Sequence, residues 1–125
     1  MRFMMIMIPS PKDDANWDPT PEAVASMGSY NEELTKAGVL LTLDGLHPGS
    51  KGARVSFPGG RATVTDGPFT EAKEVIGGYW LIQAKSKEEA VEWASRCPAA
   101  DGDVIEVRQV YEMADFPPEV QEAAR

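Results

Sequence analysis

Two side chains are candidates for proton-transfer chemistry, the histidine at position 47 and the aspartate at position 66. His47 is the only histidine in the chain, and an imidazole titrates near neutrality, so it can act as a general acid or base. A carboxylate bonded to its second ring nitrogen would fix the tautomer, and Asp66 is the candidate for that part. In the alternative interpretation His47 is a surface-loop residue, and Asp66 is a turn residue whose carboxylate accepts hydrogen bonds from nearby backbone N–H groups.

The residues after Asp66 are candidates for contact with a substrate. Gly67, Pro68 and Phe69 suit a tight chain reversal with the phenyl ring anchored in the core, and the alternative is that they form the wall of a cleft. Lys73 can hold an anionic group of a ligand, or it can pair in solvent with the glutamates beside it.

The composition argues against a metal centre, a cofactor and a disulfide. The chain has one cysteine and one histidine, which cannot supply a zinc ligand set or an intrachain disulfide. The Gly77-Gly78 pair enters a strand, so it lacks the strand-to-helix context of a phosphate-binding loop. We therefore expect no metal and no cofactor, and we expect Cys97 to be buried and inert near a helix C-terminus.

Charge and hydropathy narrow the class of partner. The net charge is −8, the basic residues are scattered, and an acidic chain repels phosphate backbones, so we expect no nucleic-acid binding. No apolar run approaches the length of a membrane span, and the apolar start Met1–Ile8 lacks the cleavage site of a signal peptide. These features predict one cytoplasmic domain over residues 1–125, without membrane association.

The hydrophobic pattern predicts two helices and six strands in the order β-α-β, hairpin, β-α-β. The first helix begins at Thr20-Pro21-Glu22 and runs to about Ala37, and the second begins at a Ser86/Glu89 capping box and runs to about Arg96. Strands are expected over 2–8, 39–43, 53–57, 62–65, 77–84 and 103–111. Residues 114–125 are expected to form a loosely held C-terminal tail with a short helix.

This order predicts a ferredoxin-like α+β fold, an antiparallel sheet with both helices on one face. The strands over 2–8 and 79–82 are apolar on both sides, so the face without helices needs a cover. A second copy of the same sheet is the simplest one. The sequence therefore predicts a homodimer that packs through its sheet faces.

One segment resembles a known family. Residues 64–98 read VTDGPFTEAKEVIGGYWLIQAKSKEEAVEWASRCP, which is similar to the YCII-related family and to its branch named for the Asp-Gly-Pro-Phe motif. The resemblance rests on Asp66–Phe69, Lys73-Glu74, Gly77–Tyr79, Ser86–Ala90 and Trp93–Pro98. It implies a dimeric α+β barrel of ferredoxin-like subunits without a settled activity. Relatives in the wider superfamily include small lactone isomerases and monooxygenases, and some members are encoded beside sigma factors.

Two functions from different classes follow. A His–Asp pair in the cleft has been proposed as catalytic in the YCII branch. The resemblance therefore implies that His47 and Asp66 are catalytic residues. The chain would then be a small cofactor-free enzyme that uses acid/base chemistry on a small acidic or lactone-like compound. The alternative is a non-catalytic metabolite-binding or regulatory dimer, linked to sigma-factor transcription control. An imidazole and a carboxylate within hydrogen-bond reach in a partly apolar pocket would favour the enzyme.

Overall fold

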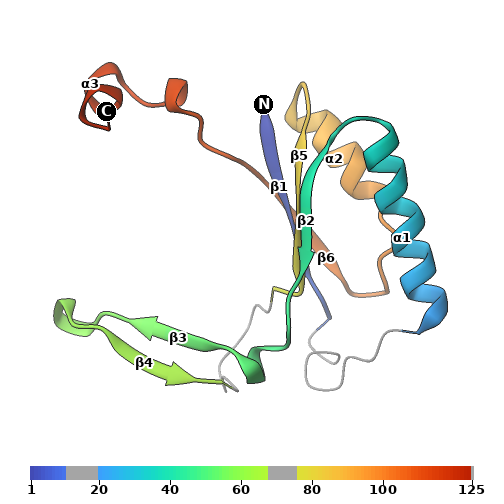
Figure 1. Ribbon diagram of the computed structural model, residues 1–125, viewed down its shortest axis with the longest axis horizontal. Helices are drawn as coiled ribbons and strands as arrows, with labels where there is room; N and C mark the ends of the chain where they lie inside the picture. Colours follow the sequence, from blue (N-terminus) through green and yellow to red (C-terminus); the bar gives the residue numbers. More distant parts are fainter. Residues whose placement is uncertain (11–19, 68–75, 125) are drawn as a thin grey trace.

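The computed structural model describes residues 1–10, 20–67 and 76–124, and its centre is a four-stranded antiparallel sheet covered on one face by two helices (Figure 1). The strand order is β2-β5-β1-β6, which is the ferredoxin-like order predicted from the sequence. The elements are β1 (Arg2–Ile8), α1 (Pro21–Lys36), β2 (Leu40–Gly45), η2 (Gly49–Lys51), β3 (Ala53–Ser56), η3 (Pro58–Gly60), β4 (Thr63–Asp66), β5 (Gly78–Gln83), α2 (Lys87–Ser95), β6 (Val104–Gln109), η4 (Met113–Asp115) and α3 (Pro118–Ala123).

Local signals at both ends determine the length of α1. The Thr20 hydroxyl accepts a hydrogen bond of 3.1 Å from the Ala23 N–H, which satisfies one of the free donors of the first turn. At the other end Gly38 adopts a φ of 72°, its N–H binds the Thr35 carbonyl, and the Val39 N–H binds the Leu34 carbonyl. This is the Schellman arrangement, and it ends the helix where the chain must turn back into β2.

The second helix also begins at the predicted cap. The Ser86 hydroxyl accepts from the Glu89 N–H at 3.1 Å, while the Glu89 carboxylate accepts from the Lys85 N–H at 2.9 Å. The carboxylate thus reaches one residue further back than in a standard capping box.

The core lies between the helices and the sheet, and Tyr30 joins three of its elements. The Tyr30 hydroxyl donates to the Trp93 carbonyl of α2 at 2.7 Å, and its ring meets the Trp80 indole of β5 edge-on at 5.9 Å between centroids. Strand alternation supplies the remaining buried contacts, because every second residue of β1 and β5 points at the helices. The buried apolar residues are Phe3, Met5, Tyr30, Leu34, Trp80, Ile82, Ala84 and Ala90.

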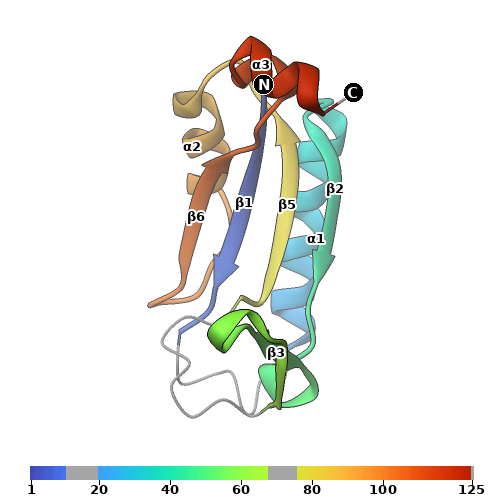
Figure 2. The same ribbon diagram turned by 90° about the vertical axis from the view of Figure 1, so that its left-hand side faces the viewer.

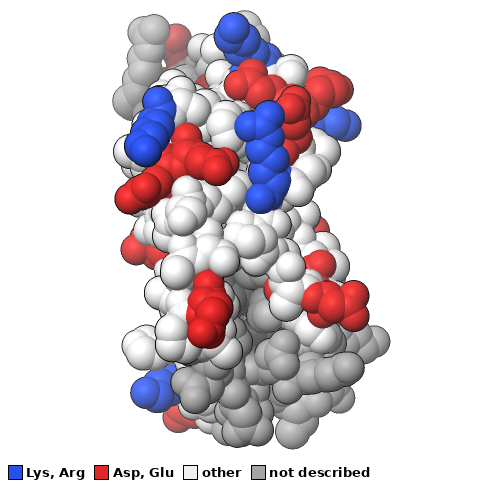
Figure 3. Space-filling view, turned by 90° about the vertical axis from the view of Figure 1, so that its right-hand side faces the viewer, with Lys and Arg blue, Asp and Glu red and all other residues white. Residues whose placement is uncertain are grey.

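Neither α1 nor α2 covers the opposite face of the sheet (Figure 2). Met4 of β1 lies opposite Leu81 of β5, and Ile6 lies opposite Tyr79. All four side chains are only half-buried, so they form an apolar strip that remains open to solvent. The outer surface of α1 and α2, by contrast, carries charged groups of both signs (Figure 3). The helices thus face water with polar groups, whereas the open sheet face combines this apolar strip with charged residues of β6, since Glu106 lies opposite Ile6 and Arg108 opposite Met4.

Two arms extend from this open face at opposite ends of the strands (Figure 1). One is the β3–β4 hairpin, whose strands pair with each other and form a separate two-stranded sheet. The other is the chain after β6, which contains η4 and α3. The hairpin was predicted from the sequence, whereas its separation from the main sheet was not.

Tyr30→Phe tests the link between the two helices. The substitution leaves the Trp93 carbonyl without its donor and keeps the ring, so the free energy of unfolding should fall by about 1–2 kcal/mol in urea titrations. Tyr111→Phe is the matched control, because Tyr111 is 71% exposed, and it should change stability by less than about 0.5 kcal/mol. Equal effects of the two substitutions would contradict the assigned role of Tyr30.

The stability of Tyr30→Phe should also depend on pH differently from that of the wild type. Burial raises the pKa of the Tyr30 phenol in the folded state, so folding favours the neutral form. This contribution is complete below the pKa of an unfolded tyrosine, about 10, and is lost as the pH rises above that value. Tyr30→Phe should therefore lose less stability than the wild type between neutral and strongly alkaline pH.

Candidate functional site

A cavity of about 520 Å³ lies between the first half of α1 and the end of the sheet where β1 stops. Its walls come from α1, from the end of β2 and the loop after it, from the start of β5, and from the loop between α2 and β6. Most of the lining is apolar, and Met27, Leu43 and Trp80 are part of it. Its size and lining are those of a site for a small organic molecule.

Asn31 supplies an oriented amide in this lining. Its Oδ1 accepts the indole N–H of Trp80 at 2.8 Å, which fixes the side chain and leaves the NH₂ group as its free donor. Among the described residues no acceptor is paired with that NH₂ group. Asn31 can therefore donate to a carbonyl or carboxylate oxygen of a bound molecule. Sequence reasoning missed it, because its partner Trp80 lies far away in the chain.

His47 lies among the residues that line the cavity, and it is exposed. The backbone holds its loop on both sides. The Leu46 N–H binds the Gly77 carbonyl at 2.9 Å, and the Lys51 N–H binds the Pro48 carbonyl at 2.9 Å. His47 is therefore part of the cavity lining and open to solvent.

Asp103 closes one end of the cavity with backbone hydrogen bonds. One carboxylate oxygen accepts from the Ser10 N–H at 3.0 Å, and the other accepts from the Ala100 N–H at 2.9 Å. Both oxygens are therefore occupied, and the residue clamps the chain after β1 to the loop before β6. This contact could not be predicted either, because it joins segments from the two ends of the sequence.

Asp44 and Tyr79 form a polar pair on the open face of the sheet, because Tyr79 lies opposite Asp44 and alternates along β5 with Trp80, whose side chain is buried on the helix side. The Tyr79 hydroxyl donates to the Asp44 carboxylate at 2.7 Å, and this hydrogen bond is the main cause of the raised pKa of Tyr79. The strands approach closely beside the pair, because a Cβ on Gly78 would lie 2.8 Å from the Asp44 carbonyl oxygen. This close approach of two backbones explains the glycine at position 78.

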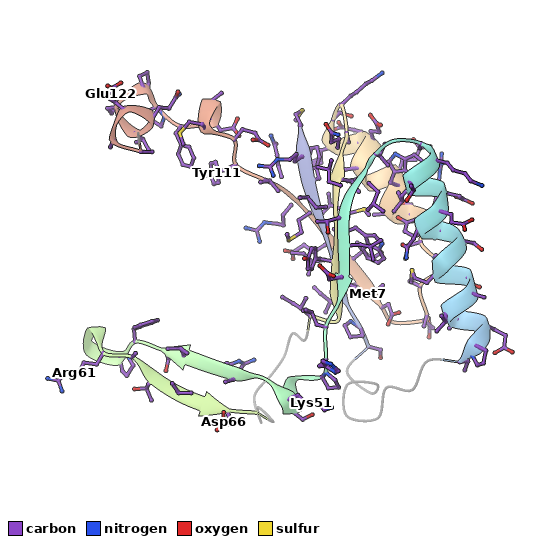
Figure 4. All side chains as sticks on the ribbon, in the orientation of Figure 1. Met7, Lys51, Arg61, Asp66, Tyr111 and Glu122 are labelled. Carbon is purple, nitrogen blue, oxygen red and sulfur yellow. The ribbon has the colours of Figure 1, made fainter. Side chains whose placement is uncertain are left out.

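Asp66 is exposed at the end of β4, opposite Ala53, and is not among the residues that line the cavity. It lies at the base of the hairpin, while Arg61 lies at its far end (Figure 4). No hydrogen bond or ion pair joins the Asp66 carboxylate to the His47 imidazole, both of which lie in the described part of the chain. The dyad of His47 and Asp66 therefore stays a prediction.

Gly67 brings the start of the Asp-Gly-Pro-Phe motif against the loop that follows His47. Its N–H donates to the Gly52 carbonyl at 2.9 Å, and a Cβ built on Gly67 would overlap the carbonyl oxygen of Gly49. Close approach of two backbones is thus the reason for a glycine here. The other predicted contact residues, Pro68, Phe69 and Lys73, lie outside the described residues.

The part of the chain that the structure describes contains no cluster of three potential metal ligands and no helix long and apolar enough to cross a membrane. Burial raises the pKa of the Cys97 thiol to about 11, which keeps this half-buried group protonated at neutral pH. Neither observation adds a second candidate site to the cavity.

The fold and the cavity define a small ferredoxin-like α+β domain with a pocket at one end of its sheet. The model of the YCII-related domain matches residues 1–114, and the chain belongs to this family. An uncharacterised protein of Rhizobium meliloti (strain 1021) is 32% identical over 68 residues, which cover 54% of this chain and 55% of that protein. The chain thus spans about half the length of this relative, and α3 lies beyond the family match.

Gly67→Ala tests the backbone contact beneath the motif. The added methyl group cannot fit against the Gly49 carbonyl, so the base of the hairpin must move, and we expect faster amide hydrogen exchange in 49–67 together with a lower melting temperature. Gly45→Ala is the matched control, since a Cβ there has no neighbour within 4 Å. Unchanged exchange in Gly67→Ala would show that the motif does not depend on this contact.

Proposed function

We propose that this domain binds a small acidic or lactone-like molecule in the cavity beside α1 and transfers a proton on it without a cofactor, with His47 as the general acid or base. The single observation behind this proposal is the mostly apolar cavity whose lining includes both Asn31, with its amide fixed by Trp80, and His47. Neither group alone would distinguish a reactive site from an ordinary surface depression.

The lining suggests a division of labour. The apolar walls would take up the hydrocarbon part of the molecule and displace water. The Asn31 NH₂ would donate to its carbonyl or carboxylate oxygen, which makes a neighbouring C–H more acidic. His47 would then remove or return the proton at that carbon.

In this proposal the other residues predicted from the sequence lie at the edge of the cavity and assist His47 or bind the substrate. The contact of Gly67 with η2 supports a place for Asp66 near the loop that follows His47, and in this proposal its carboxylate orients the imidazole when a ligand is bound. Pro68, Phe69 and Lys73 are proposed to contact the substrate, with Lys73 binding its anionic group. The same motif supports placing the chain in the Asp-Gly-Pro-Phe branch of the family.

The alternative is a metabolite-binding regulatory domain, with a link to sigma-factor transcription control. One observation favours it: the His47 imidazole has no carboxylate bound to it in the described structure. The cavity would then bind its ligand without turnover. Both functions use the same cavity and differ only in what happens to the bound molecule.

We also propose that two copies pack through their open sheet faces. The apolar strip of Met4, Ile6, Tyr79 and Leu81 lies in the middle of that face. Burial of such a strip is a strong source of association energy. Glu106 and Arg108 flank the strip and form an ion pair with each other, and an identical partner related by a two-fold axis would bury the same strip on both copies.

Ala23→Trp should abolish ligand binding. Ala23 is exposed on the first turn of α1 and lines the cavity, so an indole there fills the space without disturbing the core. The measurement is a thermal-shift and NMR screen of small aromatic carboxylates and lactones, in which binding raises the melting temperature. Ala25→Trp is the matched control, because Ala25 is exposed on the same helix and does not line the cavity. Equal binding by both variants would place the site elsewhere.

A molecule identified in this screen then separates the enzyme from the regulatory domain. If His47 transfers a proton, His47→Gln should lower the rate of deuterium exchange at the acidic carbon of the bound molecule by about 100-fold or more, while its Kd changes little. Asp66→Asn should lower the rate less if Asp66 only orients the imidazole. The absence of any exchange in the wild type would support the regulatory function.

Leu81→Arg tests the sheet-face dimer. The wild type should have twice the 13.6-kDa chain mass in light scattering, and a charge in the middle of the face should shift it to the mass of one chain. Val91→Arg on the exposed side of α2 is the control and should keep the mass of the wild type. A wild type with the mass of one chain at micromolar concentration would exclude the dimer.

A further inference from the structure

The hairpin has one apolar side that nothing in its own chain covers among the described residues. Val55 of β3 pairs directly with Val64 of β4, so the two side chains share a face. Val55, Phe57 and Val64 are 52%, 65% and 63% exposed. A two-stranded hairpin is marginally stable alone in water, and this one needs a surface to pack against.

The C-terminal arm has a matching apolar group and a fixed starting direction. The rings of Tyr111 and Phe116 stack at 4.8 Å between centroids, and Met113 beside them is 51% exposed. At the base of the arm the Arg2 guanidinium binds the Glu112 carboxylate at 2.6 Å. This ion pair ties the start of the arm to β1, and from there the arm extends away from the helices (Figure 1).

The two arms carry opposite charge. From Lys51 to Asp66 the hairpin region contains three basic residues and one acidic residue, in a chain with a net charge of −8. From Glu112 to residue 124 the other arm contains four acidic residues and no basic one. The hairpin is therefore locally basic, and the C-terminal arm is locally acidic.

The arms leave the same face of the sheet at opposite ends of the strands (Figures 1 and 4). A two-fold axis parallel to the strands would bring hairpin beside hairpin and acidic arm beside acidic arm. An axis perpendicular to the strands, in the plane between the sheets, would instead bring each hairpin beside the acidic arm of the other copy. Like charges disfavour the first arrangement, and opposite charges with two uncovered apolar groups favour the second.

We infer that in the dimer the β3–β4 hairpin of each copy packs against the C-terminal arm of the other, with the Val55/Val64 side on the Tyr111/Phe116 stack and Arg61 near the acidic residues of α3. This inference rests on the proposed sheet-face dimer and specifies its orientation. The two arms then clasp each copy of the sheet at both ends.

Cross-linking in a Cys97→Ala background tests the orientation. Val64→Cys and Val120→Cys each place one exposed thiol on one arm, and a short bismaleimide joins thiols that lie close together. Cross-linked dimer should form when the two single variants are mixed and allowed to exchange subunits. Neither variant should cross-link alone.

The other outcomes are distinct. Cross-linking of Val64→Cys with itself, or dimers by light scattering without cross-linking in the mixture, would overturn the arm-to-arm contact and leave the dimer standing. A wild type with the mass of a single chain would overturn the dimer itself.

Charge reversal gives a second readout. Arg61→Glu should raise the dimer dissociation constant roughly two- to fivefold at low salt and less at high salt. Adding Glu119→Lys and Glu122→Lys to that variant should restore the wild-type value. Lys87→Glu makes the same charge change on the helix side and should leave the constant unchanged. An Arg61→Glu effect that the two lysines do not reverse would contradict the pairing.

Discussion

A central strand that is apolar on both faces, in a sheet covered by helices on one face only, is the constraint on which the rest of this structure depends. Phe3 and Met5 of β1 are buried against the helices, while Met4 and Ile6 lie on the open side. Within one chain, the helices bury the apolar side chains on one face of this strand. The apolar side chains on the other face have no covering layer among the described residues. Both arms extend from the sheet on this uncovered side.

The core and the cavity share side chains, which couples the fold to the candidate chemistry. Trp80 packs against Tyr30 in the core, and its indole N–H holds the amide of Asn31 in the cavity wall. Asp103 clamps the chain at the other end of the cavity through two backbone N–H groups. The polar groups of the site are thus held by contacts that also stabilise the domain, so a ligand would meet an oriented donor rather than a mobile one.

Features determined by neighbouring residues were predictable from the sequence, and contacts between distant residues were not. The caps at Thr20 and Ser86 follow from short-range hydrogen bonding, whereas strands that are apolar on both sides did not show which half of their side chains faces the helices. The second strand was predicted over 39–43 but runs to Gly45, because pairing with β5 continues to Gly78. The pair of Asn31 with Trp80 joins segments whose proximity only the folded chain reveals. The backbone contact of Gly67 with η2 is likewise a contact between segments that are separate in the sequence, and the sequence did not indicate it.

The pairing of β1 also has a consequence for the order in which the domain can form. Arg2 pairs with Gln83 on one side, and Phe3 pairs with Gln109 on the other. The strand β1 therefore waits for the synthesis of β5 and β6 before its hydrogen bonds are completed. Such long sequence separation slows folding, because the entropy cost of closing long loops comes before the strand hydrogen bonds that offset it. During that interval an apolar, β-prone segment is unprotected, which makes chain synthesis the period of greatest exposure to aggregation.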